Sequence, residues 1–236
     1  MSRRKENRSL PPAEETPDPS RRRRSPIPRP KGKAGGLIEL VVIVAIALGL
    51  ALAIQAWVVK PYKIPSGSME PTLDVGQRVL VNRFIYHFHE PRIGDIVVFH
   101  PPDGVETGPR TECGALVGGR APLEVGEACP RPNPGESSQT FVKRVVAVGG
   151  DTLSVRDGHP VVNGVEKTDE PYIDPCGRAS VCDLPKTITI PKGYFFMMGD
   201  NRGESDDSRF WGPVPREWIV GEAFATYWPP DRIGGL

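Results

Sequence analysis

Residues 140–151 read TFVKRVVAVGGD, and this stretch carries the clearest structural signal in the chain of 236 residues. Valine dominates it, β-branched residues are enriched in strands, and the Gly-Gly pair marks a turn near its end. Side chains of a strand alternate between two faces, so Lys143 shares a face with Phe141 and Val145. A lysine between apolar neighbours loses hydration, which disfavours its charged form and lowers its pKa. The alternative is the commoner fate of a strand lysine, an exposed face.

Short β-type runs recur on both sides of this stretch, separated by Gly and Pro. They lie at residues 78–84, 95–99, 152–156, 187–190, 194–198 and 223–228. Closely spaced short strands with little helical periodicity predict a mainly β, antiparallel domain over residues 60–236. Residues 101–139 are rich in Pro, Gly and charge, and a loop of that length is uncommon in a compact domain. We interpret them as an insertion.

Residues 37–59 are almost wholly apolar and predict a transmembrane helix. About 23 residues at a rise of 1.5 Å cross the hydrocarbon core of a bilayer, which is about 30 Å thick. A buried helix of a globular protein would normally show a polar stripe, and residues 40–54 have none. A cleavable signal sequence is the closer alternative, because residues 51–53 form an A-x-A pattern. The apolar run is nevertheless longer than the usual 7–15 residues or so of such a sequence.

Charge is distributed unevenly along the chain. Residues 1–36 carry 11 Lys or Arg against 4 Asp or Glu, whereas residues 37–236 carry 19 against 25. Few large apolar side chains lie in the first segment, which predicts a disordered tail. Basic clusters can bind nucleic-acid phosphates, but excess Lys and Arg just before a span marks its cytoplasmic side. We therefore expect a cytoplasmic N-terminus, an extracytoplasmic body and no nucleic-acid partner.

The four cysteines form two local pairs, Cys113/Cys129 and Cys176/Cys182. No Cys-x-x-Cys motif or nearby histidine spacing suggests zinc, so we expect neither a metal nor another cofactor. In an oxidising compartment each pair could close a short loop as a disulfide. Four free thiols are the alternative, and the sequence leaves both open.

Two further segments contain residue types that suit catalysis. Residues 62–73, YKIPSGSMEPTL, place two serines around a glycine in a Pro-bounded turn that could present a hydroxyl and N–H groups to a carbonyl. Residues 199–209, GDNRGESDDSR, follow an apolar run and could form a hydrogen-bonded network that fixes a site. Taken singly, the first is a common kind of turn and the second a solvated loop.

Together these segments resemble the type I signal peptidase family, whose members use a serine and a lysine as a catalytic dyad. The resemblance lies in residues 64–73, 94–99, 142–146 and 199–209, in that order and after a membrane anchor, and it covers most of residues 60–228. It departs at residues 203–204, Gly-Glu, and in the insertion, which has no clear counterpart. The implied fold is an antiparallel β-sheet catalytic domain of signal-peptidase type preceded by one transmembrane helix.

The resemblance also implies roles for individual residues. Ser68 matches the nucleophile, Lys143 the general base, and Ser66 the hydroxyl that helps the Ser68 N–H bind the oxyanion. Ser205 matches the serine that hydrogen-bonds the lysine. The positions of the supporting salt-bridge network are Arg144, Asp200, Asp207 and Arg209. The positions that line the substrate pockets are Tyr62, Ile64, Pro65, Met69, Leu73, Phe141 and Val142.

The implied activity is that of a membrane-bound serine endopeptidase that removes N-terminal signal peptides from exported preproteins after small residues, in an A-x-A pattern. Neutral Lys143 would take the Ser68 proton, and a water activated by the same lysine would release the acyl-enzyme. The substrate would add as a strand to residues 62–66 and 140–142. The implied partners are preproteins, the lipid bilayer and a nearby secretion translocon, with the catalytic body at the outer face of the plasma membrane.

Four other hypotheses are weighed against this one. A peptidase dedicated to a few surface substrates would have the same sequence features. A Ser/His/Asp protease is the weaker hypothesis, because none of the four histidines lies in a triad-like motif. A self-cleaving repressor-type Ser/Lys protease would normally lack a membrane span. A non-enzymatic membrane-tethered β-domain would leave the combination of Ser68, Lys143 and Ser205 unexplained.

Overall fold

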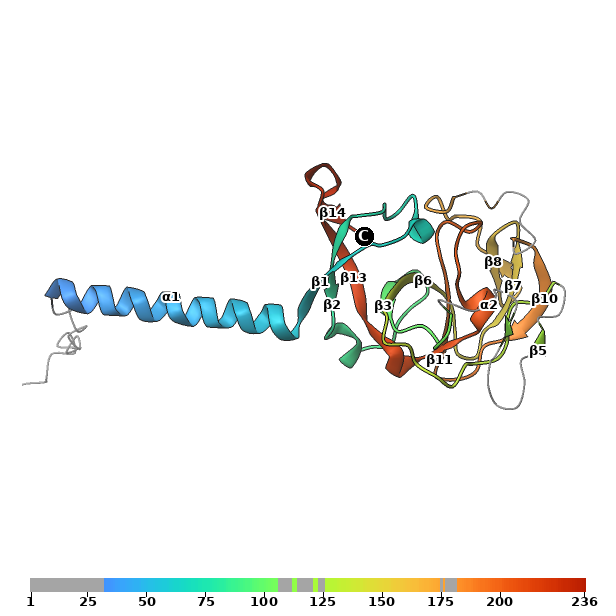
Figure 1. Cartoon of the computed structure of the whole chain (residues 1–236), viewed down its shortest axis with the longest axis horizontal. Helices are drawn as coiled ribbons and strands as arrows, with labels where there is room; N and C mark the ends of the chain where they lie inside the picture. Colours follow the sequence, from blue (N-terminus) through green and yellow to red (C-terminus); the bar gives the residue numbers. More distant parts are fainter. Residues whose placement is uncertain (1–31, 106–111, 114–120, 123–125, 175, 177–181) are drawn as a thin grey trace, which may run out of the picture. The chain divides into compact units, whose positions relative to one another are not determined.

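The structure, a computed structural model, describes residues 32–105, 112–113, 121–122, 126–174, 176 and 182–236. Most of the predicted basic tail and parts of the predicted insertion lie outside these residues. The described chain consists of a long N-terminal helix followed by antiparallel sheets (Figure 1).

Helix α1, Gly32–Trp57, contains the apolar segment Gly36–Gln55, which is long and apolar enough to cross a membrane. Every side chain of that segment is exposed. A helix that is apolar all round and has no protein partner suits a lipid environment. The helix ends at Trp57, two residues before the predicted end of the span. Val59 already belongs to strand β1, Val59–Lys63, which pairs with β2, Arg78–Asn82.

The larger sheet has eight strands in the order β1–β2–β13–β3–β6–β11–β12, with β14 paired to β13. Its remaining members are β3 (Ile96–Phe99), β6 (Phe141–Val148), β11 (Tyr194–Met198), β12 (Val214–Pro215), β13 (Ile219–Trp228) and β14 (Gly234–Gly235). Each of its pairings is antiparallel, which confirms the predicted fold class. Strand β13 begins before the predicted residue 223, because its first residues pair with β3.

A smaller sheet has the order β10–β7–β8–β9. Its strands are β7 (Thr152–Arg156), β8 (His159–Val162), β9 (Val165–Glu166) and β10 (Leu184–Thr189). Within the predicted insertion, β4, Glu112–Cys113, pairs with β5, Ala121–Pro122. The described helical turns are η1 (Gly67–Met69), η2 (Ile85–His87), α2 (Ser208–Trp211), η4 (Arg216–Trp218) and η5 (Pro230–Arg232).

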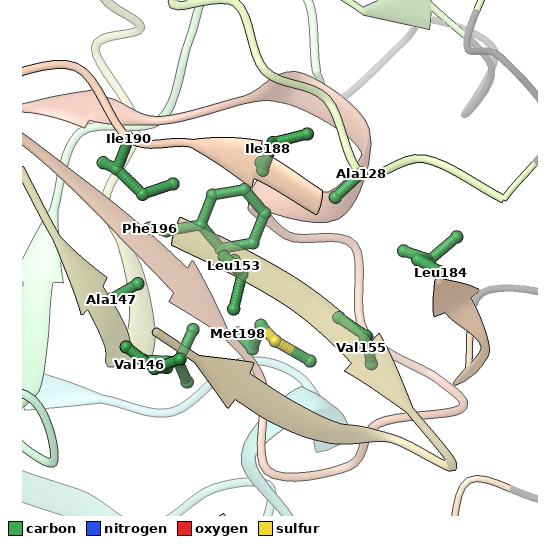
Figure 2. Packing of buried hydrophobic residues seen from close by; sticks show 11 residues of the cluster. Ala128, Val146, Ala147, Leu153, Val155, Leu184, Ile188, Ile190, Phe196 and Met198 are labelled. Carbon is green, nitrogen blue, oxygen red and sulfur yellow. The ribbon is translucent and has the colours of Figure 1, made fainter. Parts of the chain in front are cut away.

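Strand β6 lies between β3 and β11 and supplies the core on both of its faces. Val145 belongs to one cluster of buried side chains, while Val146 and Ala147 belong to another. Val146 and Ala147 are adjacent, and adjacent residues of a regular strand face opposite sides. They share a cluster because Val146 is an extra residue in the pairing with β11, and this bulge changes the alternation. Figure 2 shows the second cluster, in which Phe196 and Leu153 pack between the two sheets.

A third cluster lies beneath the turn at residues 64–73. Ile64, Met69 and Leu73 are almost fully buried there against Val79 and other side chains of the larger sheet. These three apolar anchors hold both ends of the Ser-Gly-Ser segment, so the turn has a fixed place over the sheet.

Both cysteine pairs are disulfides, and the free-thiol alternative does not hold. Cys129 N–H also donates to Arg209 O at 2.9 Å, which ties the base of the insertion to α2. The second disulfide packs closely on the turn between β7 and β8, where a Cβ on Gly158 would lie 2.9 Å from Cys176 Cβ.

Leu153 tests the contribution of the core between the sheets, since it is fully buried there. Leu153→Ala should lower the free energy of unfolding by about 2–5 kcal/mol, because truncation leaves a cavity in a packed core. Val165→Thr is the matched control, as Val165 is 60% exposed and its change should stay within about 0.5 kcal/mol. Urea unfolding of the full chain in detergent measures both, and equal effects would contradict this assignment of the core.

Candidate active site

The candidate nucleophile, Ser68, lies in the helical turn η1. The turn is held from both sides: Ile64 N–H donates to Gln77 O at 2.9 Å, and Asn201 N–H donates to Ser68 O at 3.2 Å. With Met69 buried beneath it, the main chain around Ser68 has little freedom. The Ser68 hydroxyl is therefore presented from a fixed backbone.

Lys143 comes from the middle of β6 and reaches the same hydroxyl. Its Nζ lies 2.5 Å from Ser68 Oγ, although the two residues are 75 positions apart in the chain. The side chain is 3% exposed and lies 5.7 Å from the centre of the Phe141 ring. The prediction of an apolar face is confirmed, and the alternative of a solvated strand lysine is wrong.

Burial lowers the pKa of Lys143 from 10.5 to about 8. Removal of the ammonium from water is the largest cause, and it is opposed by the nearby negative charges of Asp207 and Asp206. The positive charge of Arg209 lowers the pKa further. A substantial share of the amine is therefore neutral near pH 8 and can accept a proton from Ser68.

The four residues predicted for the supporting network form two ion pairs, and both pairs are bidentate. Arg144 donates to Asp200 at 2.8 and 2.7 Å, and Arg209 donates to Asp207 at 2.8 Å through each of two nitrogens. All four residues are buried. For Asp207, burial alone would raise the pKa, but Arg209 and a bond from Gly199 N–H outweigh it, so the pKa is lowered and the carboxylate stays charged.

Gly199 explains why the chain after β11 and the turn that carries Ser68 approach so closely. A Cβ at this position would collide with Ser205 Oγ and with the main-chain oxygen of Ser68. Only a glycine allows the end of β11 to pass directly behind the nucleophile.

Ser205 lies at this crossing but does not make the predicted bond. Its Oγ donates to the main-chain oxygen of Asp206 at 3.4 Å, and among the described residues it makes no hydrogen bond to Lys143. The predicted lysine-orienting contact is therefore absent in this structure. The reason is that the hydroxyl points to the adjacent peptide group.

Ser66 lies at the open side of the turn, with its hydroxyl 3.5 Å from Ser68 Oγ. The backbone of Ser66 is extended, and its side chain makes no capping bond to η1. It can therefore turn toward a substrate carbonyl next to the Ser68 N–H.

A cleft of about 530 Å³ opens over the dyad. Of the predicted pocket residues, Ile64, Pro65, Met69, Phe141 and Val142 line it. Leu73 does not, because it is completely buried in the cluster beneath the turn, and Tyr62 packs against that cluster instead. A role of Leu73 and Tyr62 in the substrate pockets stays a prediction.

Sequence reasoning missed three functional candidates, namely Asn201, Thr72 and Tyr172. Asn201 lines the cleft, and its amide donates to Gly67 O at 3.3 Å. Thr72 Oγ1 donates to Asp200 at 2.6 Å, and the Tyr172 ring lies 3.8 Å from the Arg144 guanidinium carbon. Asn201 and Thr72 belong to the quoted motifs, so their position was a usable signal, whereas nothing in the sequence singles out Tyr172.

No group of three or more metal-ligating side chains occurs within the described part of the chain. Each of the four histidines contacts a main-chain oxygen instead: His87 that of Phe84, His89 that of Glu90, His100 that of Gln139 and His159 that of Lys167. The base that contacts Ser68 is Lys143.

Comparison with known proteins shows the family of the chain. The family described as "Signal peptidase, peptidase S26" matches residues 37–228. A probable signal peptidase I-1 from Synechocystis is 36% identical over 183 residues, 78% of each chain. A signal peptidase I from Leptolyngbya laminosa is 36% identical over 184 residues, 78% of this chain and 75% of its own. That of Mycobacterium tuberculosis is 35% identical over 206 residues, 75% and 68% of the respective chains.

The family match spans the apolar helix, the nucleophile turn, β6 and the loop after β11, which are the segments that build the cleft. This chain belongs to the signal peptidase family, peptidase S26.

Proposed function

We propose that this protein is a membrane-anchored serine endopeptidase that removes signal peptides from exported preproteins, with Ser68 as nucleophile and Lys143 as general base. The observation that carries the proposal is the 2.5 Å contact between Lys143 Nζ and Ser68 Oγ beside an open cleft. Relatives named signal peptidase I support the substrate class.

Acylation begins when neutral Lys143 takes the proton of the Ser68 hydroxyl. The oxygen then attacks the scissile carbonyl, and the Ser68 N–H and the Ser66 hydroxyl stabilise the oxyanion. The lysine gives its proton to the leaving amine as the peptide C–N bond breaks. The signal peptide remains bound to Ser68 as an ester, and the mature protein is released.

Deacylation uses the same lysine, which is neutral again after the first half of the reaction. It takes a proton from water, and the hydroxyl attacks the ester carbonyl. The bond to Ser68 Oγ breaks, and the proton returns to that oxygen. One base with a pKa of about 8 therefore serves both halves.

Substrate selection rests on the apolar side of the cleft. Ile64, Pro65 and Val142 leave shallow space there for small side chains at the first and third positions before the cut. The extended end of the signal peptide would add as a strand to residues 62–66 and 140–142, so main-chain hydrogen bonds would hold the peptide and the shallow pockets would exclude bulky side chains.

The anchor places enzyme and substrate on one surface. Helix α1 would cross the plasma membrane once, with residues 1–36 as a cytoplasmic tail and residues 60–236 outside. The basic tail supports this orientation, and the disulfides support an oxidising compartment. Confinement to the bilayer, close to the secretion translocon, raises the effective concentration of preprotein at the cleft.

The dyad predicts how three variants behave in cleavage of a preprotein by the full chain in detergent. Ser68→Ala and Lys143→Ala should each lower the rate by at least about 10²–10⁴-fold, because the nucleophile or its base is lost. Lys143→Arg should fail equally, since a guanidinium stays protonated. Substantial turnover by either lysine variant would mean that another group deprotonates Ser68.

The substrate supplies the matched control for this assay. A preprotein whose alanine immediately before the cut is replaced by tryptophan should resist the parent enzyme, whereas the alanine form is cut. Equal cleavage of both would contradict selection of small side chains by the cleft.

The pKa of Lys143 predicts a pH profile. The base is the neutral amine, so kcat/KM should rise with pH and reach half of its maximum near pH 8, with a fall of about tenfold per unit well below that value. Asp206→Asn removes a negative charge that raises this pKa, so its profile should move to lower pH. A midpoint near 10.5, or no displacement in the variant, would refute this account.

The tail and the single span predict which side of the membrane each part occupies. Protease added to intact spheroplasts should digest residues 60–236 and spare the N-terminal tail, which an antibody to each end would detect. Digestion of the tail with protection of the body would reverse the orientation.

A further inference from the structure

Residues 170–174, which we call the support segment, lie along the loop that follows β11. Asp174 N–H donates to Asp200 O at 3.0 Å, and Asp174 also forms a parallel bridge with Asn201. Asn201 N–H in turn holds Ser68 O, so the support segment is one residue away from the nucleophile turn. None of its side chains takes part in the chemical steps of the reaction.

A buried carboxylate, that of Glu170, organises the support segment. Glu170 is 8% exposed, and one of its oxygens accepts a hydrogen bond from the Tyr172 hydroxyl at 2.9 Å. The other oxygen lies 3.4 Å from both Arg202 Nη1 and His159 Nδ1. Arg202 is itself completely buried and donates through Nε to Gly199 O at 3.0 Å. Glu170 is therefore fixed at both oxygens, and it sets the position of the Tyr172 ring.

The Tyr172 ring covers a face of Arg144 that the hydrogen bonds of Arg144 leave open. A guanidinium is planar, and its donors lie in that plane. All three nitrogens are used there, by Asp200 at 2.8 and 2.7 Å and by Gly94 O at 2.8 Å. The Tyr172 ring lies over the flat face, with its centre 3.8 Å from the guanidinium carbon. A ring at this distance attracts the cation through its negative face and blocks movement of the guanidinium out of its plane.

We propose that Tyr172 is a positioning residue for peptide cleavage and that it acts through Arg144. Its ring keeps the guanidinium in the plane in which it binds Asp200, the residue before the one that holds the nucleophile turn. Arg144 also follows Lys143 on β6, so the same contact fixes the base. The role rests on the proposed function, in which Ser68 and Lys143 form the dyad.

The contact should affect the rate of cleavage more than the binding of substrate. The proton passes from Ser68 to Lys143 over a contact of 2.5 Å, and displacement of either main chain lengthens that contact. A misplacement of about 1 Å can cost about 10²-fold in rate. Tyr172 is not among the described residues that line the cleft. A loosened Arg144 should therefore lower kcat and leave KM nearly unchanged.

Fluorination of the ring tests the contact without changing the shape of the side chain much. Tyr172→Phe is the reference variant, because it keeps the ring and loses only the hydroxyl. Tyr172→pentafluorophenylalanine reverses the charge distribution of the ring, so that its face repels a cation. In cleavage of a preprotein by the full chain in detergent, its kcat should be about 3–30-fold lower than that of the reference, with KM within about twofold.

The matched control places the same fluorinated ring where it meets no cation. Phe196 is completely buried between the two sheets (Figure 2), and no cation–π contact involves it within the described part of the chain. Phe196→pentafluorophenylalanine should keep the kcat of the parent enzyme. Urea unfolding of each variant gives its folded fraction, so that kcat refers to folded enzyme in every case.

The outcomes separate the positioning role from the proposed function. Equal kcat values for the fluorinated variant and the reference at position 172 would overturn the positioning role and leave the dyad untouched. A rise in KM in place of the fall in kcat would mean that Tyr172 contacts the substrate, which also contradicts the proposal. If the parent enzyme does not cut the preprotein, or Ser68→Ala cuts it equally well, the proposed function fails and the positioning role fails with it.

Discussion

The geometry of the site depends on the ion pair between Arg144 and Asp200. Arg144 follows Lys143 on β6, and Asp200 precedes Asn201, whose N–H holds Ser68, so this pair joins the base to the nucleophile turn. Buried ion pairs are worth little unless every donor and acceptor is used, and removal of one partner typically costs about 3–5 kcal/mol. Here the remaining groups are used: Arg144 also donates to Gly94 O at 2.8 Å, and Asp200 accepts from Thr72.

Burial also lowers the pKa of Lys143, which allows the amine to act as a base. Adjacent carboxylates favour the charged form of a lysine, and Asp207 does raise the pKa of Lys143. Asp207 is, however, paired with Arg209, whose positive charge lowers the pKa of Lys143 and offsets part of this effect. Desolvation therefore prevails, and a base results without a histidine. The network thus positions the dyad, while desolvation sets the direction of the pKa shift.

The sequence predicted those features that depend on short-range pattern. Residues 152–156 and 194–198 became β7 and β11 with the same bounds, and alternation correctly buried Lys143. Strand β1 was missed, because its Lys60, Pro61 and Lys63 are poor strand formers and only the pairing with β2 makes them extended.

The limits of prediction at the site have a different cause. Motif position brought Ser68 and Lys143 together, and the four residues assigned to the network do form ion pairs. It did not reveal that Leu73 is buried beneath the turn or that the Ser205 hydroxyl donates to the main chain. These details depend on packing between segments far apart in the chain, such as Gly199 against Ser68. The contact of Tyr172 with Arg144 could not be predicted from the sequence for the same reason.

The disulfide between Cys113 and Cys129 closes a loop within the insertion, and the base of that loop is fixed. Cys129 is bonded through its N–H to Arg209 O, and neighbouring Gly212 has no room for a side chain beside Arg131 O, so the base is part of the scaffold around α2. Chain added between the two cysteines is closed off at that base, and the entropy of loop closure grows only slowly with length. Chain added between the two cysteines should therefore leave the dyad undisturbed. For the same reason this loop is the natural place to insert an epitope or a reporter into an active enzyme.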